Sequence, residues 1–180
     1  MELTGIILAG GQSKRMKQDK GLLTYKGKKL IEYGILLLNP YVDKIIISTD
    51  NPGYSQFGYP LVPDEYKGIG PIGGLYSALK VSGSPGNLVI PCDMPDLTAE
   101  IMEKLIQHKE GQQAVVLGTS GNYRIPTVGF YRISSLKVIE NQIKKNDFKL
   151  QNLIDELNAK IIRVSAEEKI RNINSPSDLV

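Results

Sequence analysis

The chain has 180 residues, of which 41% are hydrophobic and 23% are charged. This composition is close to the globular average and excludes a disordered, fibrous or disulfide-framed protein, so we expect one folded domain over residues 1–180. The net charge of +3 comes from 22 basic and 19 acidic residues that are too dispersed for a nucleic-acid or membrane surface.

Short apolar runs rich in β-branched residues alternate with segments of helical period, which predicts a three-layer αβα domain around a mainly parallel mixed sheet. The first half of the chain is expected to contain a strand at Thr4–Leu8, a small-residue loop at Ala9–Ser13, a helix at Lys29–Leu38, a strand at Lys44–Ser48, a break at Asp50–Gly53 and a short strand at Leu61–Val62.

The second half continues the alternation. In order, it is expected to contain a glycine-rich loop at Gly68–Gly74 leading into a helix, a strand at Leu88–Ile90, a helix from an N-cap at Thr98 to about His108, strands at Ala114–Leu117 and Val128–Tyr131, helices at Ser134–Lys145 and Leu150–Leu157, and a strand at Ile161–Val164.

The loop after the first strand is typical of an anion-binding site. Gly10 and Gly11 allow backbone N–H groups to approach a ligand, and four cations follow within nine residues, at Lys14, Arg15, Lys17 and Lys20. The alternative is a tight turn with a solvated basic flank. The motifs GxxxxGK[ST] and GxGxxG are both absent, and Asp50 lies too far along the chain for a ribose-binding acid, which disfavours an NAD-dependent oxidoreductase.

Asp93 follows the strand Leu88–Ile90 and is expected at the sheet edge where Gly10 lies, since ligands bind at the carboxyl ends of strands. A carboxylate there can hold Mg²⁺ together with substrate phosphates. The alternative is a turn aspartate that caps its own backbone beside Pro95.

Two further candidates are weaker. Asp64 follows a short strand and precedes the glycine-rich loop, so it is either a nucleotide contact or a turn residue. Asn172 and Asn174 would share one face of an extended segment, but Ser175 and Pro176 after them equally fit a helix start.

Cys92 and His108 are the sole cysteine and histidine. They exclude an internal disulfide and a soft-ligand zinc site, so any metal should be bound by oxygen. We interpret Cys92 as a small buried side chain and His108 as a cation at a helix C-terminus. The residues from Met1 to Leu8 contain no basic leader, which makes the cytoplasm the expected location.

Four motifs in this order resemble the molybdenum cofactor guanylyltransferase family over nearly the whole chain. They are Leu8-Ala9-Gly10-Gly11-x-Ser13-x-Arg15-Met16-x-x-Asp19-Lys20, Gly70-Pro71-x-x-Gly74, Pro91-Cys92-Asp93-Met94-Pro95 and Asn172-Ile173-Asn174-x-Pro176-x-Asp178-Leu179. The first motif alone indicates only the wider nucleotidyltransferase superfamily. The resemblance implies a Rossmann-like nucleotidyltransferase fold.

The resemblance also implies GMP transfer from GTP to the terminal phosphate of molybdopterin, with release of pyrophosphate. The residues implied on the nucleotide side are Leu8, Ala9, Gly10, Gly11, Lys20, Ser48, Asp64, Gly70 and Asp93. Asp93 would bind Mg²⁺, Arg15 and Lys20 would neutralise phosphate charge, and Asn172 and Asn174 would lie on the acceptor side. Proteins that make or receive the cofactor would be partners.

The sequence departs from the family pattern at three places. Lys17 replaces a glycine, Arg124-Ile125-Pro126 lacks a histidine before the proline, and Ser48 stands where the family has a nucleotide-contacting asparagine. Two other interpretations therefore remain: a cytidylyltransferase or other NTP transferase acting on molybdopterin or another phosphorylated acceptor, and a nucleotide-binding regulator without turnover.

Overall fold

A seven-stranded sheet forms the centre of the molecule. The computed structural model describes residues 1–10, 19–119, 121–164, 170–173 and 178. The sheet order is β5-β4-β1-β6-β8-β7-β9, and β8 alone runs antiparallel to its neighbours. The strands are β1 (Leu3–Leu8), β4 (Lys44–Ser48), β5 (Leu61–Val62), β6 (Gly86–Pro91), β7 (Ala114–Gly118), β8 (Arg124–Arg132) and β9 (Lys160–Ile162). The mainly parallel mixed sheet is confirmed.

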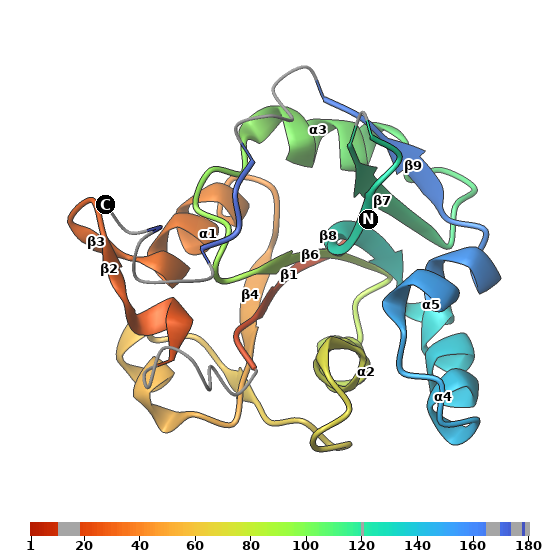
Figure 1. Cartoon of the computed structure of the whole chain (residues 1–180), viewed down its shortest axis with the longest axis horizontal. Helices are drawn as coiled ribbons and strands as arrows, with labels where there is room; N and C mark the ends of the chain where they lie inside the picture. The colour runs from red at the N-terminus through yellow and green to blue at the C-terminus, as the bar shows by residue number, and fades with distance from the viewer. Residues whose placement is uncertain (11–18, 120, 165–169, 174–177, 179–180) are drawn as a thin grey trace.

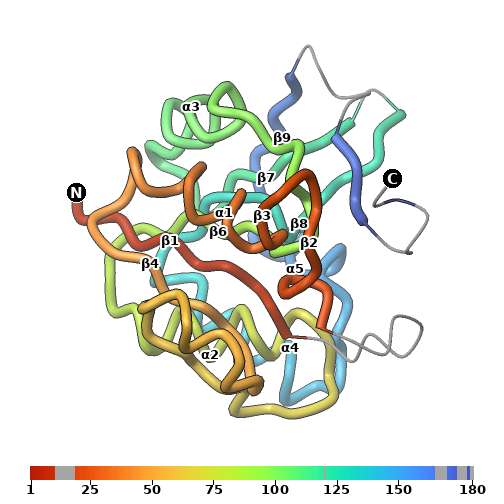
Figure 2. The backbone as a smooth tube through the Cα atoms, turned by 90° about the vertical axis from the view of Figure 1, so that its left-hand side faces the viewer, coloured from red at the N-terminus to blue at the C-terminus, as the bar shows by residue number. Residues whose placement is uncertain are grey.

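Helices cover both faces of this sheet, as Figures 1 and 2 show. On one face lie α1 (Leu30–Leu38) and α3 (Ala99–Gln107); on the other lie α2 (Pro71–Ser82), α4 (Leu136–Lys144) and α5 (Leu150–Glu156). Alternation along β1 divides the core, since Ile7 packs with α1 and α3 whereas Ile6 packs with α2, α4 and α5. The three-layer αβα fold is therefore confirmed.

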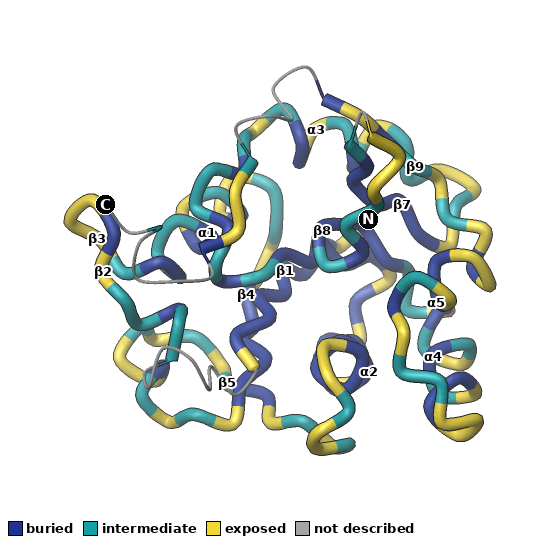
Figure 3. The backbone as a smooth tube through the Cα atoms, viewed as in Figure 1, coloured by how far each residue is buried: buried dark blue, intermediate teal, exposed yellow. Residues whose placement is uncertain are grey.

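All six residues of β1 are buried, and the centre of the sheet is mostly dark in Figure 3. Burial on both faces explains why these strands read as continuous apolar runs rather than alternating ones. In the described part of the chain, no helix has the length and apolar character needed to cross a membrane.

A small hairpin, β2 (Thr24–Tyr25) and β3 (Lys28–Lys29), was not predicted. Its turn residues Lys26 and Gly27 have φ of 45° and 85°, and lysine at the first of these positions gives no Asn-Gly or Asp-Gly signal. Two 3₁₀ helices, η1 (Lys20–Leu22) and η2 (Pro52–Phe57), were also missed, while η3 (Ile133–Ser135) leads into α4.

Three local expectations need correction. The predicted loop Gly68–Gly74 ends at Gly70, because α2 begins at Pro71. Gly73 and Gly74 belong to the first turn of this helix. Thr98 is the N-cap of α3, but its buried hydroxyl makes no capping hydrogen bond. Residues 170–173 form no strand; Arg171 and Asn172 are both exposed and only Ile173 is buried.

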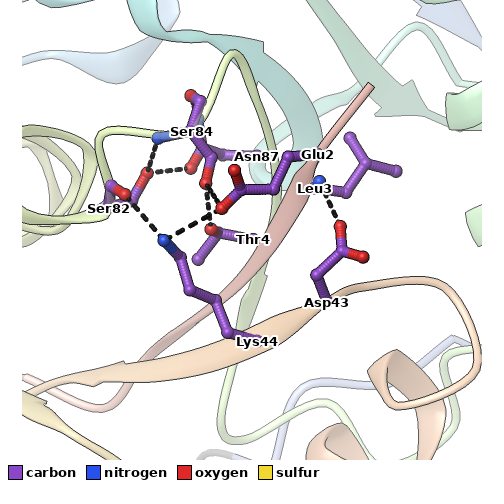
Figure 4. A network of polar contacts seen from close by, with 8 residues as sticks. All are labelled: Glu2, Leu3, Thr4, Asp43, Lys44, Ser82, Ser84 and Asn87. Carbon is purple, nitrogen blue, oxygen red and sulfur yellow. Dashed lines mark hydrogen bonds and ion pairs between the residues drawn. The ribbon is translucent and has the colours of Figure 1, made fainter.

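A buried polar network lies at the sheet edge where β1 and β6 begin (Figure 4). The Asn87 side chain accepts from the Ser82 hydroxyl at 2.5 Å and donates to the carbonyl oxygens of Ser84 and Tyr131 at 3.2 and 3.3 Å. Thr4 donates to the Ser84 hydroxyl at 2.7 Å. The network joins α2, β1, β6 and β8.

We expect Asn87→Ala to lower the free energy of unfolding by about 2–4 kcal/mol, because it leaves several buried polar groups unpaired. Urea denaturation measures this change. Asn152→Ala is the matched control, since Asn152 is exposed and bonds Asp147 at the surface; it should change stability by less than about 0.5 kcal/mol. Equal effects of the two variants would contradict a structural role for the network.

Candidate active site

The carboxyl ends of β1, β4 and β6 meet at one edge of the sheet. Leu8 pairs with Ser48 in β4 and with Pro91 in β6. Just beyond the strands, the Ala9 N–H donates to the Ser48 carbonyl oxygen at 2.9 Å and the Cys92 N–H donates to that of Leu8 at 3.0 Å. The loops after these strands therefore start from fixed positions around one region.

The larger cavity at this edge has a volume of about 730 Å³, which is in the range of small-molecule sites. It lies on the side of β4 and β5. Its walls contain every predicted nucleotide contact of the described chain except Lys20 and Asp93, namely Leu8, Ala9, Gly10, Ser48, Asp64 and Gly70. These residues come from four segments that are separate in the sequence, and the fold brings them together around one cavity.

Asp64 lies half-buried in this cavity, with an oxygen 3.5 Å from the Ser48 hydroxyl. Burial, and secondarily the charge of Asp50, raises the pKa of Asp64. Gly74 allows this approach, since a Cβ there would lie 2.7 Å from the Ser48 hydroxyl oxygen and 3.3 Å from Asp64. At the exposed mouth, Lys67 forms an ion pair with Asp50 at 3.0 Å.

A smaller cavity of about 220 Å³ adjoins the first and shares the wall formed by Leu8, Ala9 and Gly10. It contains Lys20 and Asp93, whose Nζ and Oδ2 atoms are 3.0 Å apart. Both side chains are largely covered, with 23% and 14% of their surfaces exposed. A cation and a carboxylate thus meet beside the glycine loop, which is the juxtaposition expected from the two motifs.

Asp19 is a site residue that the sequence analysis missed. It accepts hydrogen bonds from the Asn51 side chain at 3.1 Å and from the Gly21 N–H at 3.3 Å, and it contacts the hydroxyl of the fully buried Tyr54. These contacts anchor the start of η1, where Lys20 lies. A single aspartate before a lysine gives no sequence signal for this role, because its side-chain partners Asn51 and Tyr54 lie more than 30 residues away.

Cys92 and His108 do not form a nucleophile–base pair. The Cys92 thiol is buried, and burial raises its pKa, so it stays protonated near neutral pH. His108 caps α3, with its Nδ1 2.9 Å from the Lys104 carbonyl oxygen. The burial of Cys92 and the position of His108 at the C-terminus of α3 are confirmed.

The C-terminal segment reaches back to the site. The Ile173 N–H donates to the Asp93 carbonyl oxygen at 2.9 Å, and the Ile173 side chain is buried against Tyr25 and Leu30. Arg171 pairs with Asp96 at 3.2 Å. Asn172 therefore lies between two anchored residues, one of which is bonded to the loop that follows β6.

Three predicted site residues, Gly11, Arg15 and Asn174, lie outside the described residues. Within the described chain no three acidic, histidine or cysteine side chains form a metal cluster. Asp93 offers one carboxylate, whose Oδ1 is not part of the ion pair with Lys20. This donor set fits Mg²⁺, which proteins usually bind through one or two carboxylates and substrate phosphates.

Comparison with known proteins gives a consistent result. Residues 5–161 match the MobA-like NTP transferase domain. The chain is 31% identical to a probable molybdenum cofactor guanylyltransferase of Flavobacterium johnsoniae, covering 98% of this chain and 94% of that protein. It is 32% identical to the molybdenum cofactor guanylyltransferase of Yersinia pestis, covering 98% and 92%.

A solved structure is also similar over nearly its full length. The crystal structure of molybdopterin-guanine dinucleotide biosynthesis protein A from Archaeoglobus fulgidus superposes with a TM-score of 0.80 at 25% identity, covering 98% of this chain and 94% of that one. The Rossmann-like fold expected from the motifs is confirmed.

We expect Asp64→Asn to raise the Tm near pH 7, because it removes a half-buried negative charge. The rise should be only about 1–2 °C, since that charge is still partly solvated. The folded pKa of Asp64 lies above its unfolded value, so its charge destabilises the protein as pH rises through the folded pKa, and stability returns as pH falls. Thermal unfolding of both proteins between pH 4 and 7 tests this. The range starts near the ordinary pKa of aspartate, which is about 4. A lower Tm for the variant at pH 7 would contradict it.

Proposed function

The chain belongs to the MobA-like NTP transferase family, and we propose that it transfers GMP from GTP to the terminal phosphate of molybdopterin. The products are pyrophosphate and molybdopterin guanine dinucleotide. The observation that carries this proposal is the Lys20–Asp93 pair beside a wall shared by two cavities. A transfer between two substrates needs two adjoining sites with phosphate-neutralising groups where they meet.

The larger cavity is proposed to hold the nucleoside of GTP. Ser48 offers a hydroxyl that can donate and accept hydrogen bonds with a base or ribose, and Asp64 offers a carboxylate that can accept them. Gly10 lines the same cavity without a side chain that would obstruct a phosphate, and we assign the same task to Gly11. Gly70 has a φ of 80°, which favours glycine, and it starts α2 beside this cavity. Leu8 and Ala9 form the common wall.

In the proposed reaction, an oxygen of the acceptor phosphate attacks the α-phosphorus of GTP. The bond from the α-phosphorus to the bridging oxygen breaks, and that oxygen leaves with pyrophosphate. Because the attacking group is already an anion, no side-chain base is required, which agrees with the absence of a Cys–His pair. We assign the neutralisation of phosphate charge to Lys20 and Arg15.

We assign Mg²⁺ to Asp93. When bound, Mg²⁺ neutralises the charge of the triphosphate and orients it. Lys20 at 3.0 Å holds one oxygen of Asp93 in place, and the backbone bond from Ile173 holds the loop on the other side. These two contacts fix the carboxylate relative to β1.

The acceptor is proposed to enter from the smaller cavity, with Asn172 and Asn174 on its outer side. Asn172 is exposed and held near Asp93 by the bonds of its neighbours. Proteins that make or receive the molybdenum cofactor are the proposed partners, without nucleic acid or membrane, and the cytoplasm is the proposed location.

Pyrophosphate release with Mg²⁺ and molybdopterin tests this function. We expect GTP-dependent release by the native protein and a loss of about 100-fold or more in kcat for Asp93→Asn, since charge neutralisation carries the chemistry. Asp147→Asn, at a surface turn, should retain native activity, and thermal unfolding should show that all three proteins are folded.

The other outcomes have defined meanings. Preference for CTP would keep the chemistry and move the protein to a cytidylyltransferase. Binding of GTP without release of pyrophosphate would indicate a regulator. Native activity in Asp93→Asn would refute the role of Asp93.

A further inference from the structure

The smaller cavity has a wall that no predicted site residue occupies. This wall comes from β8, the antiparallel strand next to β6, and its contribution is Thr127. Figure 1 shows β6 and β8 side by side in the middle of the sheet. Thr127 lines the smaller cavity but not the larger one, so it lies on the side away from the proposed nucleoside.

An irregularity in β8 leaves Thr127 without a paired residue in β6 or β7. Val116 of β7 pairs with Gly129, whereas the next residue, Leu117, pairs with Ile125. Residues 126–128 are therefore skipped by β7, and the pairing of β8 with β6 also ends at Gly129. Bulges of this kind occur beside active sites, where they change the direction of a side chain.

Contacts within the protein hold the unpaired residues 126–128 in place. The Tyr131 hydroxyl donates to the Pro126 carbonyl oxygen at 2.6 Å, and Tyr131 is fully buried. Val128 is fully buried in the core that faces α1 and α3. With both neighbours of Thr127 fixed, its half-buried side chain has a defined position at the cavity.

The charges around the smaller cavity favour an uncharged hydrogen-bond donor for binding a phosphate there. Its described charged groups are two carboxylates, Asp19 and Asp93, and one ammonium, Lys20. Among these described side chains, a phosphate that enters the cavity meets more carboxylates than ammonium groups. A hydroxyl can donate a hydrogen bond to a phosphate oxygen without adding charge, and the Thr127 hydroxyl makes no hydrogen bond to any described residue.

We propose that Thr127 binds the acceptor: its hydroxyl donates a hydrogen bond to the acceptor phosphate that attacks GTP. This inference rests on the proposed function, because it places the attacking phosphate in the smaller cavity. Thr127 then contributes to the preference for a phosphorylated acceptor and does not contribute to binding of GTP.

The test compares Thr127→Val, which keeps the branched shape but removes the hydroxyl, with Thr127→Ser, which keeps the hydroxyl. Thr119→Val is the matched control, since Thr119 follows β7 and lines neither cavity. Pyrophosphate release is measured against molybdopterin concentration at saturating Mg²⁺ and GTP. The Kd for GTP is measured separately without acceptor.

We expect Thr127→Val to raise the KM for molybdopterin about tenfold, as for the loss of one hydrogen bond to a charged group. Its Kd for GTP should stay within about twofold of the native value, and Thr127→Ser and Thr119→Val should behave like the native protein. Restoration by serine distinguishes a hydroxyl contact from a packing role.

An unchanged KM in Thr127→Val, with native turnover in the same assay, would overturn this inference and leave the proposed function standing. A raised Kd for GTP would also overturn it, because Thr127 would then act on the nucleotide. Absence of pyrophosphate release by the native protein would overturn the proposed function and this inference together.

Discussion

The parallel pairing of β1 with a strand on each side is the constraint on which the site depends. Hydrogen bonds to β4 and β6 leave β1 no freedom of register, and burial of all its side chains prevents a slip that would exchange its two faces. The strand therefore ends at a fixed height between Ser48 and Pro91. Every loop that supplies a candidate site residue is placed relative to that end.

Electrostatics explains why this edge is suited to a charged ligand. Asp64 and Asp93 are both partly withdrawn from water, and only Asp93 has a cation in direct contact. Desolvated carboxylates disfavour their own charge, so ligands that bring hydrogen-bond donors or metal ions relieve a cost already present in the fold. For Asp64, whose burial raises its pKa, this is a cost in stability that a bound ligand would relieve.

Much of this arrangement was predictable because it depends on local pattern. Apolar runs identified the central strands, and position after a strand identified Asp64 and Asp93 as residues of the carboxyl edge. Their roles as nucleotide or metal contacts remain predictions. The contacts of Asp19 could not be predicted, since they depend on Tyr54 and Asn51 folding over η1. Thr127 was equally hidden, because it reaches the cavity through a shift in pairing between two strands.

The bond from Ile173 to Asp93 has a consequence for synthesis of the protein. It joins residues 80 positions apart, and Ile173 also fills the pocket between Tyr25 and Leu30 near the start of the chain. The strands β1, β4, β5 and β6 all precede this segment in the chain. The loop bearing Asp93 therefore gains this backbone contact only after residue 173 has been synthesised and has emerged.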